Sequence, residues 1–355
     1  MQNIIKKIRF GVIGAGHIGK RHGVMVQRNP ESSLEAICDI RSASELSLGE
    51  KDLGAVPFFQ SAEAMLASSI PMDVVSICTP NGLHAEHAIL ALESNKHVVI
   101  EKPMALSKGD CERVIFKALQ MDKQVFCVMQ NRYSPPSQWI KSVIDEGWLG
   151  KIFTVQINCY WNRDDRYYKP GGWKGTQALD GGTLFTQFSH FVDILYWLFG
   201  DISNIQARFS DFTHSHSTDF EDTGMVNFDF VQGGMGTLSY STAVAHQNFE
   251  SSLTVIAENG TVKIGGQYMN EVEYCDIKGY KMPALAPSSP ANDYGSYKGS
   301  ANNHHYIFQN VVDTLKGRTT ITTNALEGMK VVEMIESIYA QKEQAKVISS
   351  FSKRN

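Results

Sequence analysis

The sequence has no long apolar run, no surplus of basic residues and no cysteine framework, and each absence excludes a class of protein. Lys and Arg number 33 against 37 Asp and Glu, which gives a net charge of −4. Nucleic-acid binding uses a basic face, so we expect no nucleic-acid partner. A membrane helix needs roughly 20 apolar residues. The longest candidate, residues 188–199, is broken by Ser189, His190 and Asp193, so we expect no membrane association.

Cysteine is sparse, and its spacing fits neither a disulfide framework nor a metal site. The six cysteines form no C-x-x-C pair and match no zinc pattern. Three of them, Cys38, Cys78 and Cys127, lie in apolar runs, where cysteine acts as a small hydrophobic residue. We therefore expect no bound metal and predict a reducing, cytoplasmic location.

What is present is an ordinary globular composition over 355 residues, with 43% hydrophobic and 20% charged residues. That balance excludes a disordered or collagen-like chain. At about 100–200 residues per domain, the length predicts two domains.

The first third of the chain alternates short apolar runs with amphipathic segments. Strands are expected over residues 8–13, 34–40, 73–78, 97–100 and 124–129, and helices over 17–28, 85–92 and 108–121. Such alternation with short connections predicts a parallel sheet with helices on both faces. The expected fold class is α/β, and residues 1–131 form its first domain.

Beyond residue 132 the pattern changes to long strands. After a helix over 134–147, strands are expected over 151–161, 205–212, 223–231, 235–243, 253–257 and 261–264, with helices within 179–199 and over 303–316 and 325–341. Asn259-Gly260 predicts a hairpin between the last two strands. The pattern predicts an α+β domain over 132–355 with a large, open, mostly antiparallel sheet. Helices cover only one face of such a sheet, so we expect the other face to support a homodimer or homotetramer.

Residues 14–19, GAGHIG, fit the G-x-G-x-x-G pattern that cradles a dinucleotide, and they follow an expected strand and open an expected helix. Gly14 permits the tight turn, Gly16 lets the backbone approach a pyrophosphate, and Gly19 allows close packing of helix and strand. His17 and Ile18 complete the turn at the helix N-terminus, which faces the anion.

An acidic residue, Asp39, stands 20 residues beyond the last glycine, at the end of the second expected strand. Its carboxylate would accept hydrogen bonds from the adenosine ribose hydroxyls and repel a 2′-phosphate, so NAD is favoured over NADP. Arg41, two residues further on, favours NADP instead, because its cation would attract a 2′-phosphate. Both residues are therefore expected at the cofactor.

Two further motifs stand at the carboxyl ends of expected strands, where open α/β sheets bind ligands. One is Thr79-Pro80-Asn81, followed by His84, and the other is Glu101-Lys102-Pro103. We expect Thr79, Pro80, Asn81 and His84 to line the cofactor site. A lysine after the later strand would lie near the nicotinamide end of a bound dinucleotide, and Glu101 would pair with Lys102 or contact a ribose.

The combination of GAGHIG, TPNGLH and EKPMA resembles the glucose–fructose oxidoreductase/inositol dehydrogenase (Gfo/Idh/MocA) family over essentially the whole chain. The resemblance implies a Rossmann domain that binds NAD, followed by an α/β domain whose open sheet forms oligomer contacts. It also implies NAD(P)-dependent oxidation of a sugar or cyclitol hydroxyl.

In the second domain, the family motif has a glycine pair, then an acid or amide, then a histidine four residues later. Here Gly181-Gly182 precedes Thr186 and His190, which would share one helix face at i and i+4. Thr186 departs from the usual Asp or Asn. A hydroxyl can still hydrogen-bond substrate or imidazole, but it supplies no charge to a histidine–acid relay.

Oxidation of an alcohol needs a hydride acceptor, here NAD, and a base for the hydroxyl proton. His190 is the first choice for the base, because imidazole titrates near neutrality. Lys102 would hold the hydroxyl and stabilise charge on its oxygen, and the two roles can be shared or reversed. Without the resemblance, a structural helix histidine and a surface lysine are the alternative interpretations.

Residues 160–174, YWNRDDRYYKPGGWK, combine aromatic and basic side chains. Aromatic faces stack on sugars or bases and cations bind phosphate, so Arg163 and Tyr168 are expected to contact an anionic substrate. An oligomer-contact loop explains this composition equally well. The resemblance also places a His/Tyr pair near the substrate at the start of a late helix, and we expect His305 there.

Within the family, WKGT, LDGG, EDT and ENGTVKI resemble the UDP-N-acetyl-2-amino-2-deoxyglucuronate 3-dehydrogenases of surface-polysaccharide synthesis. This resemblance implies oxidation of the sugar 3-hydroxyl of a UDP-linked substrate. Two alternatives stay open: a free-sugar or inositol dehydrogenase, and a non-catalytic NAD-binding sensor. The sensor would keep the glycines and Asp39 but would need neither Lys102 nor His190.

Overall fold

A computed structural model describes residues 6–51, 53–295 and 297–352. The chain folds into two compact units, Met1–Met129 with His304–Val332, and Gln130–Asn303 with Glu333–Asn355. From the sequence, residues 132–355 were expected to form one domain, whereas residues 304–332 fold with the first unit. The expected division of cofactor and substrate binding between two domains stays a prediction.

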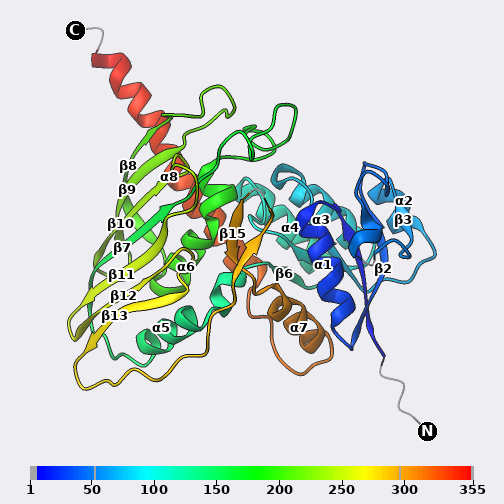
Figure 1. Ribbon diagram of the computed structural model, residues 1–355, viewed down its shortest axis with the longest axis horizontal. Coiled ribbons are helices and arrows are strands. Elements are labelled where there is room, and N and C mark those ends of the chain that lie inside the picture. The colour runs from blue at the N-terminus through cyan, green and yellow to red at the C-terminus, as the bar shows by residue number, and fades with distance from the viewer. Residues whose placement is uncertain (1–5, 52, 296, 353–355) are drawn as a thin grey trace. The chain divides into compact units, whose positions relative to one another are not determined.

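The first unit, whose segment up to β6 runs from blue to blue-green in Figure 1, is built on a six-stranded parallel sheet with the strand order β3-β2-β1-β4-β5-β6. Its strands are β1 (Ile8–Ile13), β2 (Ser32–Cys38), β3 (Phe58–Phe59), β4 (Val74–Ile77), β5 (His97–Ile100) and β6 (Val125–Cys127). Its helices are α1 (His17–Arg28), α2 (Ala62–Ala67), α3 (His84–Glu93), α4 (Lys108–Gln120), α7 (His304–Leu315) and the start of α8 (Ala325–Ser352), with short 3₁₀ turns η1 (Leu48–Lys51) and η2 (Asn81–Leu83). This order is that of a Rossmann fold, as expected.

The central strands of this sheet are apolar on both sides because both faces are covered. All four residues of β4 are buried, as are the last four of β1. Helix α7 comes from much later in the chain and packs against α1, and the ring of its Phe308 lies 5.8 Å from that of Phe10 on β1. The backbone N–H of Cys127 on β6 donates to the carbonyl of Thr323 at 2.9 Å. Residues 304–332 therefore complete the core of the first unit.

Helix ends in this unit follow the expected capping chemistry. Ser107 accepts the backbone N–H of Asp110 through Oγ at 3.1 Å and caps α4. Asn324 and Glu327 form the expected reciprocal pair at the start of α8, with N–H to carboxylate and N–H to amide oxygen distances of 3.2 and 3.1 Å. Gly317, after α7, has a φ of +71°.

The second unit is built on a seven-stranded sheet with the order β13-β12-β11-β7-β10-β9-β8. The strands are β7 (Ile152–Tyr160), β8 (Ile202–Ser210), β9 (Thr223–Phe230), β10 (Met235–Ser241), β11 (Glu250–Ala257), β12 (Gly260–Gly265) and β13 (Glu271–Ile277). Neighbours are antiparallel except β7 and β10, which run parallel, so the mostly antiparallel sheet is confirmed. The expected hairpin joins β11 and β12 through Glu258 and Asn259.

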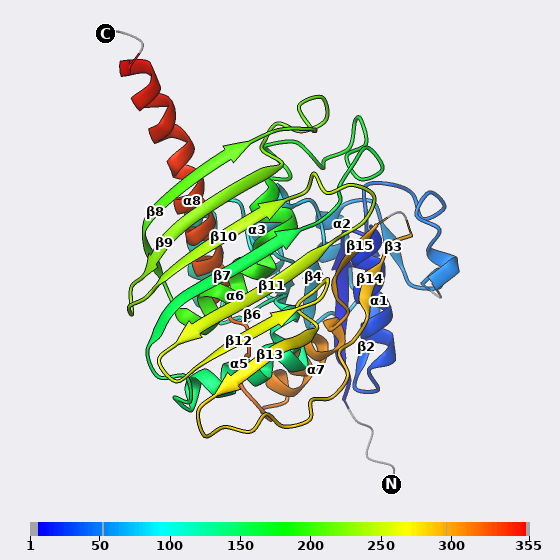
Figure 2. The same ribbon diagram turned by 60° about the vertical axis from the view of Figure 1, so that its left-hand side comes forward.

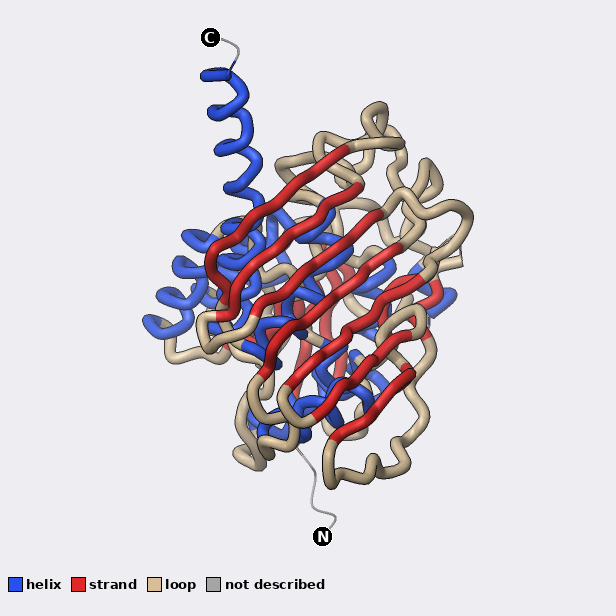
Figure 3. Tube along the Cα trace, turned by 90° about the vertical axis from the view of Figure 1, so that its left-hand side faces the viewer, coloured by secondary structure: helices blue, strands red, loops and turns tan. Residues whose placement is uncertain are grey.

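Helices pack on one side of this sheet (Figures 2 and 3). They are α5 (Pro135–Asp145), α6 (Ser189–Phe199) and the later part of α8, with the 3₁₀ turn η3 (Gln130–Tyr133) and the π-helical turn η4 (Leu184–Phe188). The sequence analysis did not predict β13, or the short strands β14 (Ala291–Asp293) and β15 (Lys298–Ala301), which form a separate hairpin. Alternate residues of β9 and β10 are buried, which matches a sheet with one covered face.

The other face of the sheet carries mostly hydroxyl and amide side chains among its described residues. Apolar exceptions on this face include Met225, Met235 and Ile256, which are 63%, 61% and 44% exposed. The expected oligomer stays a prediction. No helix in the described ranges has both the length and the apolar character to cross a bilayer.

Candidate functional site

The glycine cradle of the first unit has the shape that a dinucleotide requires. Gly14 has a φ of +90°, and a Cβ there would lie 2.5 Å from the carbonyl oxygen of Cys78. A Cβ on Gly19 would lie 1.7 Å from the carbonyl oxygen of Gly14. A Cβ on Gly16, by contrast, would approach only the guanidinium of Arg41, at 3.9 Å. Two glycines are thus needed for packing, and Gly16 leaves open space at the start of α1 for a pyrophosphate, so these residues fit NAD.

Asp39 and Arg41 form an ion pair beside this cradle. Oδ2 of Asp39 accepts the backbone N–H of Ala15 at 2.8 Å, and the guanidinium of Arg41 binds both carboxylate oxygens at 3.0 Å. Burial raises the pKa of Asp39, but the hydrogen bonds from Arg41 and Ala15 outweigh it and lower that pKa. A ribose that binds Asp39 must share the carboxylate with Arg41.

The motifs after β4 and β5 are linked by His84. Nδ1 of its ring lies 2.7 Å from the carbonyl oxygen of Pro103 and Nε2 lies 2.9 Å from that of Thr79. Because burial lowers the pKa of His84, the neutral ring donates to one of the two. His84 and Asn81 are both buried. His84 therefore holds the Thr79–Asn81 loop against the residues after β5, and its expected contact with the cofactor stays a prediction.

Glu101 and Lys102 are paired through the backbone. Oε2 of Glu101 accepts the backbone N–H of Lys102 at 3.1 Å, while Oε1 lies 2.9 Å from Nε2 of His22 on α1. The sequence analysis singled out His305, which is exposed, but its neighbour His304 is buried and lies 3.8 Å from Glu101. The role of His305 stays a prediction, His304 belongs to the same run at the start of that helix, and His22 was not expected from the sequence.

His190 in the second unit is the second residue of α6 and is buried. Nε2 of Gln130 lies 3.3 Å from Nε2 of His190 and 3.0 Å from Oγ of Ser300. The sequence analysis did not select Gln130, although it begins a polar run, Gln130-Asn131-Arg132, immediately after an apolar strand. Polar residues at that point of an α/β chain are the signal that could have indicated it.

Several buried polar groups near His190 lack hydrogen-bond partners within the described part of the chain. They are Oε1 of Gln130, both amide atoms of Asn131 and Oγ of Ser189. Leaving such a group unsatisfied costs about 1–3 kcal/mol. These groups make the surroundings of His190 in the second unit polar despite their burial.

Thr186 lies in the π-helical turn before α6, so its spacing to His190 is not the α-helical i and i+4 relation that was expected. Its hydroxyl donates to Oδ1 of Asp180 and lies 3.1 Å from the carbonyl oxygen of Asp180. Asp180 is fully buried, and its Oδ2 accepts the backbone N–H of Gly175 at 2.7 Å. A carboxylate therefore stands beside Thr186, although it belongs to the LDGG segment instead of the expected motif position.

Asp193, three residues after His190, binds Arg132. Nη2 of Arg132 lies 2.6 Å from Oδ1 of Asp193, and Nε lies 3.0 Å from Oδ2, with both side chains buried. The guanidinium also lies 5.4 Å from the ring centre of Trp197. This ion pair ties η3, and hence Gln130, to the helix that carries His190.

Arg163 is fully engaged inside the second unit. Its guanidinium donates to Gln187, to the carbonyl of Asn162, to Asn248 and to the carbonyl of Lys298 at 2.6–3.1 Å. Burial lowers the pKa of Arg163, and tyrosine and tryptophan rings surround its charge. Tyr168 is likewise buried, against Tyr167 and His214. Substrate contacts of Arg163 and Tyr168 stay predictions.

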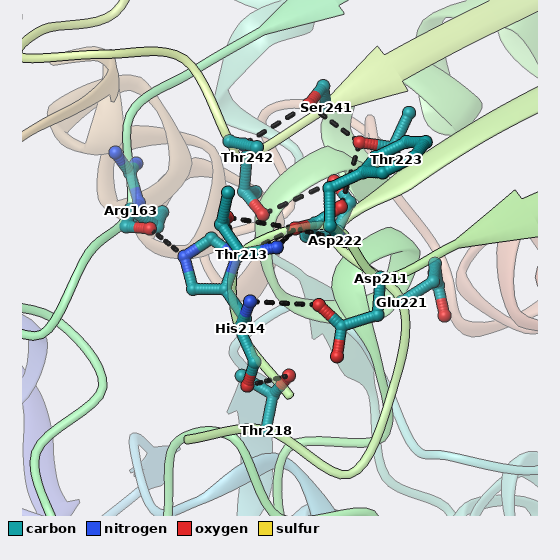
Figure 4. Close-up of polar contacts among 12 residues, drawn as sticks. Arg163, Asp211, Thr213, His214, Thr218, Glu221, Asp222, Thr223, Ser241 and Thr242 are labelled. Carbon is teal, nitrogen blue, oxygen red and sulfur yellow. Dashed lines mark hydrogen bonds and ion pairs between the residues drawn. The ribbon is translucent and has the colours of Figure 1, made fainter. Parts of the chain in front are cut away.

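A polar network connects the loop after β8 to Arg163 (Figure 4). Nδ1 of His214 lies 3.1 Å from Oδ2 of Asp222, which also accepts the backbone N–H groups of Phe212 and Thr213. Nε2 of His214 faces the carbonyl oxygen of Arg163. The network therefore fixes the backbone at Arg163.

The fold and the cradle define an oxidoreductase with an NAD-binding Rossmann domain. Residues 8–129 match the model of the oxidoreductase family with an NAD-binding Rossmann fold, Gfo/Idh/MocA, and residues 137–263 match the C-terminal domain of that family. The chain belongs to the Gfo/Idh/MocA oxidoreductase family. The family, the fold class and the cofactor expected from the sequence are confirmed.

Two similar solved structures are WlbA dehydrogenases in complex with NADH and UDP-GlcNAcA. The protein from Bordetella pertussis is 29% identical, with a TM-score of 0.83 over 96% of this chain and 98% of that chain. The protein from Chromobacterium violaceum is 30% identical, with a TM-score of 0.82 over 96% and 95%. A curated relative, D-glucoside 3-dehydrogenase of Escherichia coli K12, is 24% identical over 95% of both chains. Myo-inositol 2-dehydrogenase of Thermotoga maritima is 24% identical over 72% of this chain and 74% of its own.

Proposed function

We propose that this NAD-dependent sugar oxidoreductase oxidises the 3-hydroxyl of a UDP-linked amino-sugar acid. The observation that carries the proposal is the likeness to two solved dehydrogenases that hold NADH and UDP-GlcNAcA, at 29–30% identity over 96% of this chain. A levoglucosan dehydrogenase with its free sugar matches with a TM-score of 0.80 but at 18% identity. Sequence similarity thus favours the nucleotide-linked substrate.

In the proposed site, Gly14, Gly16, His17, Ile18 and Gly19 hold the pyrophosphate of NAD, and Asp39 with Arg41 faces the adenosine ribose. Bound NAD supplies the hydride acceptor. The remaining chemistry, which is removal of the hydroxyl proton and stabilisation of the oxygen, belongs to side chains of the protein.

We assign the proton to His190 and the oxygen to Lys102. The ammonium of Lys102 donates to the reacting hydroxyl and stabilises negative charge as the proton leaves. His190 accepts that proton through its ring. The amide of Gln130, 3.3 Å from Nε2 of His190, orients the ring, and Arg132 with Asp193 fixes the segment that carries Gln130. Thr186 and Asp180 offer a hydroxyl and a carboxylate to substrate hydroxyls.

A substrate panel tests the proposal. The purified chain is mixed with NAD and with UDP-GlcNAcA, UDP-GlcNAc, UDP-glucuronate, a methyl glucoside or myo-inositol, and nicotinamide absorbance is followed. We expect turnover with UDP-GlcNAcA, loss of turnover in Lys102→Ala and His190→Asn, and unchanged NAD affinity in His190→Asn. Turnover confined to the free sugars would overturn the nucleotide-sugar assignment.

A second candidate, oxidation of a free glucoside or cyclitol, is favoured by the relatives that are named D-glucoside 3-dehydrogenase and myo-inositol 2-dehydrogenase. Isothermal titration with UDP separates the two candidates. A nucleotide-sugar enzyme binds UDP, whereas a glucoside or inositol enzyme has no site for it. NAD binding without turnover of any panel member would favour the sensor alternative.

The open sheet face is proposed as the contact between subunits of a homodimer or homotetramer. Its exposed Met225 and Ile256 stand among polar side chains on strands β9 and β11. Sedimentation of the wild type against Met225→Glu tests this contact. Dissociation of Met225→Glu to a smaller species than the wild type supports the contact. A variant of the same size as the wild type, or a wild type that is itself monomeric, contradicts it.

A further inference from the structure

Buried hydrogen bonds in the first unit connect α1 to the backbone of Lys102, and none of the steps proposed above uses them. His22 on α1 is completely buried, and its Nε2 lies 2.9 Å from Oε1 of Glu101. The other oxygen of that carboxylate accepts the backbone N–H of Lys102 at 3.1 Å. The ring of His22 and the backbone of Lys102 therefore share one carboxylate.

The second ring nitrogen of His22 is also engaged. Nδ1 lies 2.7 Å from Oγ of Ser76 on β4 and 3.1 Å from Sγ of Cys78. A carboxylate only accepts hydrogen bonds, so Nε2 carries the proton that bonds to Glu101. The hydroxyl of Ser76 can then donate to Nδ1, and it fixes which ring nitrogen faces the carboxylate.

The carboxylate at the centre of this chain is ionised. Burial raises the pKa of Glu101, but the hydrogen bond from His22 and the nearby charge of Lys102 outweigh burial, so the pKa falls to about 2. His304 lies 3.8 Å from Oε1 of Glu101, beyond hydrogen-bond distance. His22 is therefore the imidazole that directly holds the carboxylate, and His304 is a neighbour of similar burial that does not.

Lys102 is also anchored on its other side. The next residue, Pro103, has its carbonyl oxygen 2.7 Å from Nδ1 of His84, whose Nε2 lies 2.9 Å from the carbonyl oxygen of Thr79. The N–H of Lys102 is thus tied to His22 through the carboxylate of Glu101, and the carbonyl of the next residue lies within hydrogen-bond distance of His84. Such double anchoring restricts the directions in which the lysine side chain can extend, because it fixes the backbone from which that side chain starts.

We propose that His22 is a positioning residue for Lys102. It holds the carboxylate of Glu101 in the rotamer that receives the backbone N–H of Lys102, and it thereby sets the place of the lysine ammonium. The inference rests on the proposed function for the chemistry of Lys102. The geometry that carries it lies within the first unit and requires no ligand.

Two variants of His22 separate positioning from bulk. His22→Phe keeps an aromatic ring of similar size but removes the donor to Glu101, whereas His22→Gln keeps an N–H at a similar reach. Reductive methylation of the NAD-free protein at a series of pH values, quantified by peptide mass spectrometry, reports the reactivity of Lys102. The exposed Lys151 serves as the internal reference.

In His22→Phe the hydrogen bond to the charged carboxylate of Glu101 is lost, so we expect the methylation rate of Lys102 to rise about tenfold. In His22→Gln that hydrogen bond is restored, so the rate should return to within about twofold of wild type. His304→Gln is the matched control, and it should leave the rate unchanged. Wild-type rates and pH midpoints at Lys102 in a folded His22→Phe protein would overturn the inference.

Ser76→Ala covers the case in which His22→Phe does not fold. It removes only the hydroxyl that orients the ring, and we expect the rate at Lys102 to rise about threefold. No change in the methylation rate of Lys102 in a folded Ser76→Ala protein would overturn the inference.

Once an active substrate is known, kcat of His22→Phe should fall about tenfold while KM for NAD stays within about twofold of the wild-type value. A wild type that oxidises no UDP-sugar but shows this labelling pattern would refute the proposed function and leave the positioning role supported.

Discussion

The side-chain amide of Gln130 lies 3.3 Å from Nε2 of His190 and 3.0 Å from Oγ of Ser300, and all three side chains are buried. The amide thus engages one ring nitrogen of His190. Gln130 therefore restrains the orientation of the imidazole that we propose as the base.

Replacement of Gln130 should slow the chemistry more than it weakens binding. In Gln130→Met the bulk remains but the amide is lost, so we expect kcat to fall about tenfold or more because the base is no longer held in one orientation. Steady-state kinetics with the active UDP-sugar measure this change. Ser300→Ala, which removes only the second partner of the amide, should lower kcat less than threefold, by rough analogy with loss of one neutral hydrogen bond. Equal kcat values for Gln130→Met and the wild type would refute the orienting role.

The glycine cradle offers a matched pair of variants that separates folding from cofactor binding. In Gly19→Ala the new Cβ would lie 1.7 Å from the carbonyl oxygen of Gly14, so backbone must move. We expect a loss of stability of about 3 kcal/mol or more, seen as a lower Tm. In Gly16→Ala the Cβ meets only Arg41 at 3.9 Å. The Tm should hold while NAD affinity falls about tenfold, by analogy with other close backbone–phosphate approaches. A Gly16→Ala protein with wild-type NAD affinity would show that the pyrophosphate binds elsewhere.

Removal of the Asp39 carboxylate should change the choice between NAD and NADP. Asp39→Ala eliminates both the ribose acceptor and the partner that holds Arg41 at 3.0 Å. We expect NAD affinity to fall about tenfold and NADP affinity to rise, since the released guanidinium can bind the 2′-phosphate. Isothermal titration with each dinucleotide measures both effects. Glu45→Ala, which alters a nearby exposed acid, is the control and should leave the ratio of affinities unchanged. Tighter binding of NADP than NAD by the wild type would mean that Arg41 outweighs Asp39.

The sequence was sufficient to predict most of the fold because local patterns and the Rossmann spacing agree. Residues 8–13, 17–28 and 97–100 have the predicted bounds, and the capping pair Asn324 and Glu327 forms as predicted. The return of residues 304–332 to the first unit was not predictable in this way. It depends on long-range contacts, such as that between Phe10 and Phe308, which leave no periodic signal in either segment.

In the candidate site, too, local patterns were informative and long-range contacts were not. Motif spacing selected the glycines, Asp39, Glu101, Lys102 and His190 as candidates, because each stands at a strand end or in a recognisable pattern, and their roles stay predictions. His22, Gln130 and Asp180 were missed, since their importance arises from what they contact after folding. The hydrogen bond from Thr186 to Asp180 shows the difference, because the charge absent from the motif position is supplied from six residues earlier.

Acid should destabilise the first unit through His304. Burial lowers the pKa of this imidazole from its usual 6.5 to about 3, so the folded chain keeps it neutral while the unfolded chain binds a proton below pH 6.5. The unfolded state therefore holds more protons between those two values, and stability falls as the pH drops through that window. At pH 5 the cost is about 2 kcal/mol relative to pH 7. Urea unfolding at both pH values measures the difference.

His304→Gln removes the titrating group, so its free energy of unfolding should change about 2 kcal/mol less between pH 7 and pH 5 than that of the wild type. His305→Gln is the neighbouring control. Partial burial also lowers the pKa of His305, but its side chain is exposed, so its removal should alter the slope far less. The pKa of Glu101 is lowered from its usual 4.5 to about 2, so its contribution to stability is lost only as the pH falls from 4.5 towards 2. That range lies below the two pH values compared here. A wild type and a His304→Gln protein with the same pH dependence would show that His304 is protonated without cost in the folded chain.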